Sequence, residues 1–251
     1  MASSMLPSTV DNIVVVDDIM KMTKICIREC RTPDRKRVIG AWALYQDVND
    51  LIPANKGWQP PETPFPPPFE IVPLESKGRG LVATRRIQKG EVIIRERPII
   101  MIPKMFWTNR RYQKLPEDSI MLQLLYLLEQ RDRERFLQLH NCMSLDEYVP
   151  PSGILRTNAL AALFPESKEC PGYSVICLNI SYANHSCDPN ATHRFDRKTI
   201  TKALLATRNI ERGEEITTAY IDTSSPKSDR QEQLKRRYRF TCNCTLCSTQ
   251  M

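Results

Sequence analysis

Three cysteines near the end of the chain need a partner from elsewhere. Cys242, Cys244 and Cys247 form a C-x-C-x2-C pattern. A structural zinc ion takes four thiolate or imidazole ligands in a tetrahedron, and such a pattern supplies three of them from one tight loop. Neither Cys nor His follows Cys247, so the fourth ligand is expected from a distant segment. This requirement ties the end of the chain to another part of the fold.

The segment 181–190, SYANHSCDPN, holds a candidate for that fourth ligand. Asn, Asp and Ser beside Pro favour a turn, and a turn with amides and an imidazole offers little to a hydrophobic core. Among the other cysteines, only Cys187 lies in a turn with so many polar groups. With Cys187 as the fourth ligand, zinc would hold the end of the chain against Asn184 and His185. A redox-active tail and a disulfide stay open as alternatives.

Composition favours a metal over disulfides. The chain has nine cysteines, an odd number, and its first 17 residues lack the basic start and long apolar core of a secretion signal. The longest apolar run, Ile120 to Leu128, is too short to span a membrane. We expect a soluble protein of the nucleus or the cytoplasm, with no membrane partner. The net charge of +7 suits an acidic or nucleic-acid partner but decides nothing.

Four motifs, in this order along the chain, resemble the signature of SET-domain lysine methyltransferases. They are KGRGL at 77–81, NHSCDPN at 184–190, GEEIT at 213–217 leading to Tyr220, and the C-terminal cysteines. The spacing of Tyr220, Tyr238 and the cysteines is similar to that of the SET-and-MYND (SMYD-like) subfamily. Residues 98–140 contain no cysteine, so we expect the MYND zinc module to be missing. Because the chain ends soon after the cysteines, we also expect no C-terminal helical domain.

The resemblance implies an α+β, β-rich SET fold. It predicts small β-sheets, a helical insert at about 98–172, and a knot-like crossing of segment 184–190 with the C-terminal part. The expected domains are an N-terminal segment 1–70 with a proline-rich linker at 59–68, a SET domain at 71–222, and a zinc-binding post-SET tail at 223–251.

The resemblance also implies an activity, which is methyl transfer from S-adenosylmethionine to a lysine amine of a protein, histone or non-histone. Asn184 and His185 would hold the adenine and nearby atoms, and Phe240 would stack on the adenine. Tyr220 and Tyr238 would line the lysine channel as catalytic residues that also meet the cofactor. Further cofactor contacts are expected from Lys77, Gly78, Arg79, Gly80, Asn158 and Ser181. The expected zinc ligands are Cys187, Cys242, Cys244 and Cys247.

Two other functions stay open. A catalytically silent SET-like module could bind a protein or peptide, but a silent scaffold has no need of Tyr220, Tyr238, Asn184 and His185 together. A zinc-containing nucleic-acid-binding module rests on the basic charge alone.

Local patterns predict the elements around these motifs. Alternating apolar residues predict strands within 69–97, and helical spacing predicts a helix over 116–140 with a break near 131–133. A basic helix is expected at 227–239. The stretches 84–93 and 207–216 resemble each other and predict two similar hairpins with left-handed glycines.

Two histidines are expected to have no ligand role. His140 stands among apolar positions and is expected in the core, and His193 is expected to face solvent from a strand.

Overall fold

The computed structural model describes residues 13–17, 24–31, 36–52, 61, 64–104 and 117–249. These residues fall into two compact units, between which the chain passes back and forth. The first unit takes in Met1–Pro60, Arg97–Leu137 and Ala159–Ile176, and the second Pro61–Glu96, Gln138–Asn158 and Cys177–Met251. All expected site residues belong to the second unit. Residues 59, 60, 62 and 63 of the predicted linker at 59–68 lie outside the described residues, and the predicted domain boundaries stay predictions.

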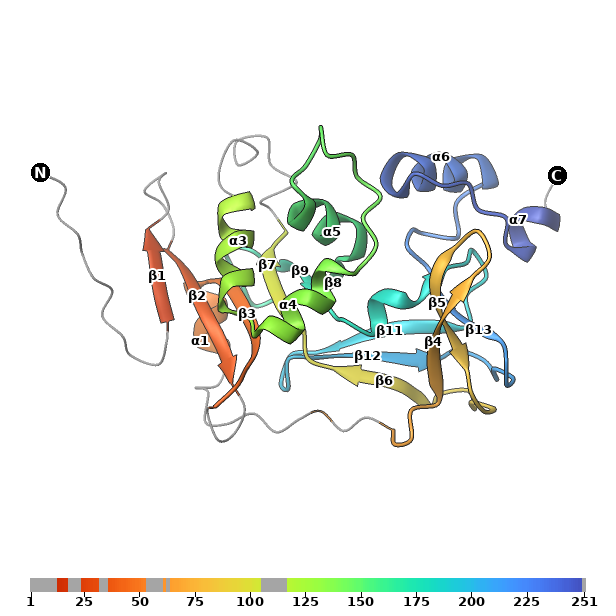
Figure 1. Ribbon diagram of the computed structural model, residues 1–251, viewed down its shortest axis with the longest axis horizontal. Helices are drawn as coiled ribbons and strands as arrows, with labels where there is room; N and C mark the ends of the chain where they lie inside the picture. Colours follow the sequence, from red (N-terminus) through yellow and green to blue (C-terminus); the bar gives the residue numbers. More distant parts are fainter. Residues whose placement is uncertain are drawn as a thin grey trace, which may run out of the picture. The chain divides into compact units, whose positions relative to one another are not determined.

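A six-stranded sheet builds the first unit (Figure 1). Its strands, in order across the sheet, are β1 (Ile13–Asp17), β2 (Lys24–Arg31), β3 (Val38–Tyr45), β7 (Ile100–Pro103), β9 (Gly172–Ile176) and β8 (Leu160–Leu163). The side chains of Trp42, Tyr45 and Tyr173 are almost completely buried. The hydroxyl of Tyr173 accepts a hydrogen bond from the Tyr45 N–H at 3.1 Å, which satisfies both polar groups inside the core.

The predicted helical insert differs from expectation in two ways. It holds the helices α3 (Glu117–Leu127) and α4 (Gln130–Leu137), but their break lies at residues 128–129, earlier than predicted. It also contributes β7 and β8 to the sheet, so it is not helical throughout. Helix α3 packs on β3, and α1 (Gln46–Leu51) follows that strand directly.

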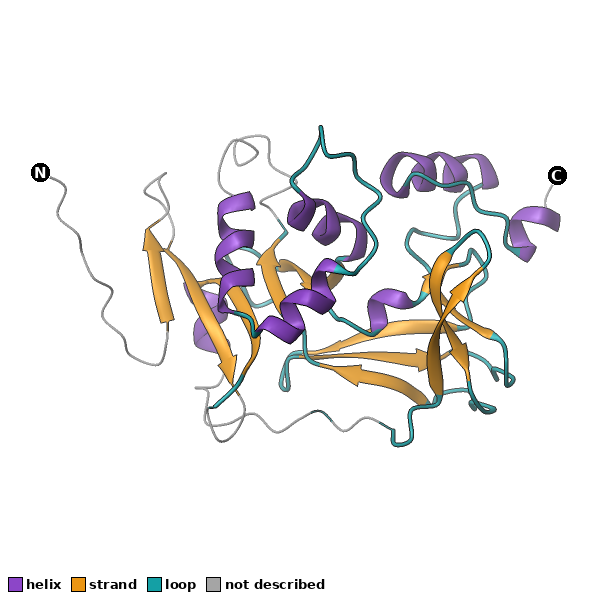
Figure 2. Ribbon diagram, viewed as in Figure 1, coloured by secondary structure: helices purple, strands orange, loops and turns teal. Residues whose placement is uncertain are grey.

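Two small sheets build the second unit (Figure 2). One has the order β10 (Asn184–His185), β13 (Glu215–Thr218), β5 (Gly78–Ala83) and β4 (Phe69–Leu74), and the other β11 (Ala191–Asp196), β12 (Thr201–Ala206) and β6 (Val92–Glu96). The cores of these sheets contain four fully buried side chains, those of Leu81, Ile93, Leu204 and Ile216. The strands expected within 69–97 are therefore confirmed, and the chain has the mixed α+β architecture expected.

Short helices complete the second unit. They are α5 (Pro150–Asn158), the 3-10 turn η1 (Ile180–Tyr182), α6 (Lys227–Tyr238) and α7 (Thr245–Thr249). Helix α6 confirms the predicted basic helix, and it buries Arg230 and Leu234, which lie one turn apart on the same face. Among the described residues, no helix combines the length and the apolar character needed to cross a bilayer.

The two repeated stretches fold alike and pair with each other. Ile87 and Ile210 exchange two backbone hydrogen bonds of 2.9 Å. Gly90 and Gly213 have φ of 85° and 84°, the left-handed conformation that favours glycine. The left-handed glycines are as predicted, but the predicted hairpins are wrong, because the strands on either side of each stretch, β5 and β6 in the first and β12 and β13 in the second, belong to different sheets. Each stretch is a turn that carries the chain from one small sheet to the other, and a turn of this kind has the same local sequence as a hairpin turn.

His140 does not lie in the core as predicted, and His193 lies on a strand as predicted but does not fully face solvent. His140 lies after the end of α4, where helical spacing no longer determines the direction of a side chain, and it is exposed. His193, on β11, is half-buried, and its Nδ1 atom is buried without a hydrogen-bond partner among the described residues.

Candidate functional site

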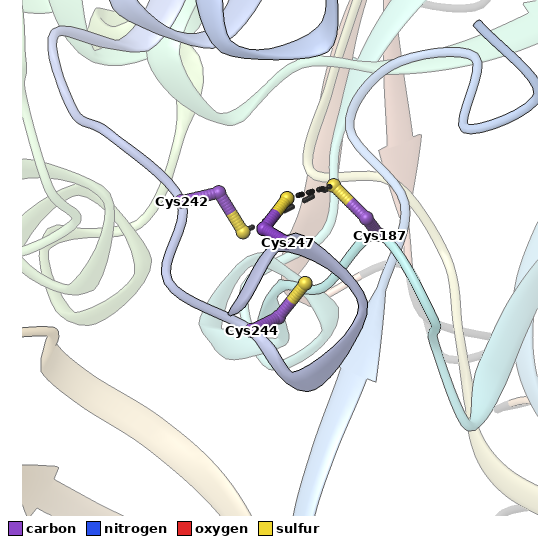
Figure 3. A group of neighbouring side chains, drawn as sticks. All are labelled: Cys187, Cys242, Cys244 and Cys247. Carbon is purple, nitrogen blue, oxygen red and sulfur yellow. Dashed lines mark hydrogen bonds between the residues drawn. The ribbon is translucent and has the colours of Figure 1, made fainter. Parts of the chain in front are cut away.

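Four thiols from two distant segments meet in the second unit (Figure 3). Cys187 follows β10, whereas Cys242, Cys244 and Cys247 lie on α7 or on the loop that leads to it. The ligand atoms of the four residues all lie within 4.8 Å of one another. Cys187 Sγ is 4.0 Å from Cys242 Sγ and 3.5 Å from Cys247 Sγ. The segments predicted to share a metal are therefore brought together.

The geometry of these thiols suits a tetrahedral metal ion. Zinc–sulfur bonds of about 2.3 Å in a tetrahedron place the sulfur atoms about 3.8 Å apart, which the two sulfur distances bracket. Burial raises the pKa of Cys187 to about 11 and also raises that of Cys242. Burial alone would raise the pKa of Cys244, but hydrogen bonds from the Cys247 and Cys187 backbone and from neighbouring thiols outweigh it and lower this pKa to about 6. Cys244 is thus the thiol most ready to become a thiolate ligand.

A buried arginine adds positive charge beside the thiols. Arg230 of α6 is only 2% exposed, and its Nη2 lies 3.7 Å from Cys247 Sγ while Nη1 donates to the Ser225 carbonyl at 2.6 Å. A buried guanidinium needs a negative partner, and four thiolates around a divalent cation carry a net charge of −2. The sequence analysis missed this residue, whose only signal is its position one turn before the buried Leu234.

His185 connects the cysteine cluster to the tyrosines. Its Nδ1 accepts a hydrogen bond from the Tyr220 N–H at 3.1 Å, and its Nε2 lies 3.3 Å from Cys187 Sγ. Burial, and then the charge of Arg230, lowers the pKa of His185 to about 4, so the ring is neutral at pH 7. Because a backbone N–H can only donate, Nδ1 carries the lone pair, and the ring proton on Nε2 points to the sulfur. Any contact of this side chain with a cofactor would therefore use the ring face.

Asn184 is held by the strands beside it. Its Nδ2 donates to the Arg79 carbonyl at 3.3 Å and to Glu215 Oε1 at 3.0 Å. A Cβ at position 80 would lie within 3.0 Å of both Leu74 Cδ1 and Asn184 Nδ2. Gly80 is therefore required by the close approach of Asn184 to the strand.

Glu215 is a second residue without a predicted role. It accepts from Asn184 and forms an ion pair with Lys77 at 2.6 Å. The only signal in the sequence was its place in the GEEIT motif. It joins the predicted residues Lys77 and Asn184 at one carboxylate.

The two predicted tyrosines lie side by side. The ring centroids of Tyr220 and Tyr238 are 5.0 Å apart, and the hydroxyl of Tyr220 donates to the Ala183 carbonyl at 2.9 Å. Burial raises the pKa of both phenols, so both stay neutral at pH 7. The His185 ring centroid lies 5.4 Å from that of Tyr220 and 6.0 Å from that of Phe240. The structure thus places Tyr220 and Phe240 beside one imidazole, with Tyr238 packed on Tyr220.

The remaining predicted residues make contacts of their own. Ser181 Oγ donates to the Cys177 carbonyl at 2.7 Å. Asn158 Nδ2 donates to the carbonyls of Ile154 and His140, both at 2.7 Å, and thereby satisfies the end of α5. Arg79 lies 4.7 Å from the centre of the Tyr182 ring. It also donates to the Gln138 carbonyl at 2.5 Å, so Arg79 and Asn158 both anchor segment 138–140. Gly78, with φ of 73°, has open space around its missing side chain.

Comparisons with known proteins agree with the motifs. The family model described as SET domain matches residues 78–221. Histone-lysine N-methyltransferase set5 of Schizosaccharomyces pombe is 30% identical over 182 residues, which are 72% of this chain and 51% of that protein. Histone-lysine N-methyltransferase SMYD3 of Homo sapiens is 43% identical over 72 residues, 29% of this chain and 16% of that protein. The chain spans about half the length of the first relative.

One solved structure is also similar. It is described as the crystal structure of the SET domain of LSMT bound to lysine and AdoHcy, with 17% identity and a TM-score of 0.44. The match covers 71% of this chain and 54% of that one.

Proposed function

Because the chain belongs to the SET domain family, we propose that it transfers a methyl group from S-adenosylmethionine to the side-chain amine of a lysine in a protein. The observation that carries this proposal is the pair of neutral tyrosines, Tyr220 and Tyr238, packed against the Asn184–His185 strand. The name of the relative set5, a histone-lysine methyltransferase, supports the same reaction.

We propose that residues around Asn184 hold the cofactor. S-adenosylmethionine supplies a methyl group activated by a sulfonium cation. Asn184, His185, Gly78 and Gly80 would offer polar partners, and Phe240 would offer an aromatic face for a flat base. Glu215 would hold two of the cofactor-binding residues in place, because it forms an ion pair with Lys77 and accepts a hydrogen bond from Asn184. The remaining cofactor contacts in the proposal are Arg79, Ser181, Asn158, Tyr220 and Tyr238.

The two tyrosines would prepare the lysine for attack. A free lysine amine has a pKa near ~10.4, and burial among aromatic rings disfavours the ammonium form. Because the phenols of Tyr220 and Tyr238 stay neutral, they add no negative charge that would hold the proton on the amine. Their hydroxyls and the Ala183 carbonyl can then orient the lone pair. Holding two reactants in line contributes as much as about 7–11 kcal/mol to a reaction barrier.

We further propose that the cysteine cluster binds one zinc ion, which closes a post-SET tail at 223–251 over the Asn184–His185 strand. The sulfur distances, the buried Arg230 and the single low pKa of Cys244 support this assignment. The order of the motifs and the short match to SMYD3 support a SET-and-MYND-like subfamily, with a SET domain at 71–222 and the crossing described for that fold. We also propose that the protein is located in the nucleus or the cytoplasm.

Transfer of labelled methyl from S-adenosylmethionine into proteins of a whole-cell extract tests the proposal. We expect discrete labelled bands with the purified chain and at least a tenfold loss with Tyr220→Phe, because one hydroxyl at the transfer site is removed. Tyr126→Phe is the matched control, since Tyr126 is 81% exposed and lies outside the site. Absence of label from zinc-loaded chain that binds the cofactor would favour a silent SET-like binding module instead.

A further inference from the structure

Helix α6 ends in three exposed basic side chains. Lys235, Arg236 and Arg237 are exposed, and within the described part of the chain none of them is in an ion pair. Glu232 lies one turn earlier on the same helix and is not paired with them. The nearby Arg239 differs, because it forms an ion pair with Glu147 at 2.8 Å. We refer to Lys235, Arg236 and Arg237 together as the basic rim.

The basic rim directly adjoins the tyrosine pair. Tyr238 follows Arg237 in the chain, and its ring packs on Tyr220. Burial raises the pKa of the Tyr238 phenol, and the charge of Arg237 opposes that rise. The Arg237 carbonyl accepts from Cys142 Sγ at 3.7 Å. Segment 141–149 therefore lies against the end of α6, where the ion pair of Glu147 with Arg239 also holds it.

A substrate lysine that reaches Tyr220 and Tyr238 must bring its flanking residues near these cations. Carboxylates there would gain favourable charge contacts, whereas a run of basic residues would be repelled. The net charge of +7 for the whole chain acts in the same direction. Cations at the end of a helix also complement its dipole, so a test must separate substrate binding from stability.

We propose that the basic rim selects target lysines flanked by acidic residues. This inference rests on the proposed methyl transfer and narrows its substrate to protein segments in which Asp or Glu stands within a few residues of the lysine. A lysine within a strongly basic tail is then a poor substrate. Each exposed charge pair is expected to change the specificity by about two- to fivefold, the usual range for such pairs.

Peptides with one central lysine test the basic rim. Three sets carry neutral, acidic or arginine flanks, and both their binding, by fluorescence anisotropy, and their methylation are measured at low and high salt. For the wild-type chain we expect acidic peptides to bind more tightly than neutral ones by about two- to fivefold per carboxylate, with a KM that falls accordingly. High salt should reduce this preference, because it screens exposed charges.

The triple variant Lys235→Gln, Arg236→Gln, Arg237→Gln should bring the ratio of acidic to neutral binding close to one. The matched control replaces three exposed cations elsewhere in the same unit, Lys89, Lys198 and Arg212, by Gln and should keep the preference. Urea unfolding of both variants separates a loss of stability from a loss of selection. Equal binding of acidic and neutral peptides by the wild-type chain, or an unchanged preference in the triple variant, overturns the inference. A binding preference without any methyl transfer supports the basic rim and contradicts the proposed enzyme.

Discussion

Single atoms decide the geometry around Asn184. The amide of this residue lies close enough to strand β5 to exclude any side chain at position 80, and its hydrogen bonds to the Arg79 carbonyl and Glu215 leave it in one orientation. His185, one residue later, is bound at both ring nitrogens. The two residues of the NHSCDPN motif therefore owe their positions to the protein and do not require a ligand to order them.

Comparison of Gly80→Ala with a variant at a glycine of positive φ should separate the effect of a steric clash from that of backbone strain. The new Cβ would collide with Leu74 and Asn184, so we expect a loss of stability of about 1–3 kcal/mol, the usual cost of overpacking, together with weaker cofactor binding. Gly90→Ala is the matched control: its φ of 85° costs about 1–2 kcal/mol, but a Cβ there meets no described atom within 4 Å, and Gly90 lies outside the proposed cofactor site. Urea unfolding and calorimetric titration with S-adenosylhomocysteine measure both effects. Equal cofactor affinity in the two variants would contradict the role given to Gly80.

His193 should make stability depend on pH. Burial, and then the charge of Lys202, lowers its pKa to about 4, below the value of about 6.5 in an unfolded chain. Between these values the unfolded chain binds more protons, so the free energy of unfolding falls as the pH drops from 6.5 to 4. We expect His193 to account for on the order of 2 kcal/mol of that fall, after allowance for its partial exposure. Urea unfolding of His193→Gln across this range should show a correspondingly flatter profile. A profile parallel to that of the wild type would refute the assignment.

At the scale of elements, the similar turns at 84–91 and 207–214 share a hydrogen-bond pattern but differ in one further contact. In each, a glutamate accepts from an arginine at 2.6 Å and from a backbone N–H at 3.0 Å, as Glu91 does with Arg85 and Glu214 with Arg208. Glu214 accepts one further bond, from Asn190 Nδ2 at 3.0 Å. Asn190 in turn accepts from the Thr217 N–H on β13. The side chains of the second turn are therefore linked through Asn190 to β13, the strand that pairs with Asn184 and His185.

This difference predicts that replacing each of the two glutamates by glutamine has unequal effects on stability and on cofactor binding. Glu91→Gln should cost about 0–1 kcal/mol of stability, as for an exposed ion pair. Glu214→Gln should cost about 1–2 kcal/mol, because it also disturbs a partly buried hydrogen bond, and it alone should weaken cofactor binding. Urea unfolding and calorimetric titration of the two variants provide the comparison. Equal losses of stability and of cofactor affinity in the two variants would mean that the hydrogen bond between Glu214 and Asn190 contributes to neither.

At the scale of the whole molecule, the two compact units differ in whether they contain candidate site residues. The first unit has its own sheet and core around Trp42 and Tyr173, whereas all candidate site residues lie in the second. In the second unit the cysteine cluster brings α7 and the loop before it next to the segment that follows β10, and Arg230 of α6 lies beside Cys247. In the core of this unit, Cys187, Cys242 and Cys247 pack with Ile221 and Leu234, and Tyr220 and Phe240 cover them.

Metal removal should therefore affect the units unequally. We expect about one zinc per chain by elemental analysis, since four thiolates complete one tetrahedral site, and loss of that zinc on chelation or in Cys187→Ser. Hydrogen exchange should then speed up in β10, α6 and α7 but stay unchanged in β3 and β9. Cys170→Ser is the matched control, because Cys170 is a buried thiol of the first unit that donates to the Gly172 carbonyl. Uniform exchange changes, or zinc retained in Cys187→Ser, would contradict this division.

The sequence by itself determined the features that depend on neighbours in the chain. The basic helix at 227–238, the strands around Gly80, the left-handed turns at Gly90 and Gly213, and the pattern of the three C-terminal cysteines all follow from local spacing and turn chemistry. The motif order also identified the family, because four separate patterns rarely occur together by chance. Cys187 could be named because a tetrahedral ion demands a fourth ligand.

Only the tertiary structure decided the contacts between distant segments. The bridge that Glu215 makes between Lys77 and Asn184, the guanidinium of Arg230 beside Cys247, and the exposure of His140 have no local signature. A single charged residue looks the same in a sequence whether it faces water or a buried partner. Its burial depends on which remote segment packs against it, since the cost of burying a charge is offset only by a partner that the fold brings there.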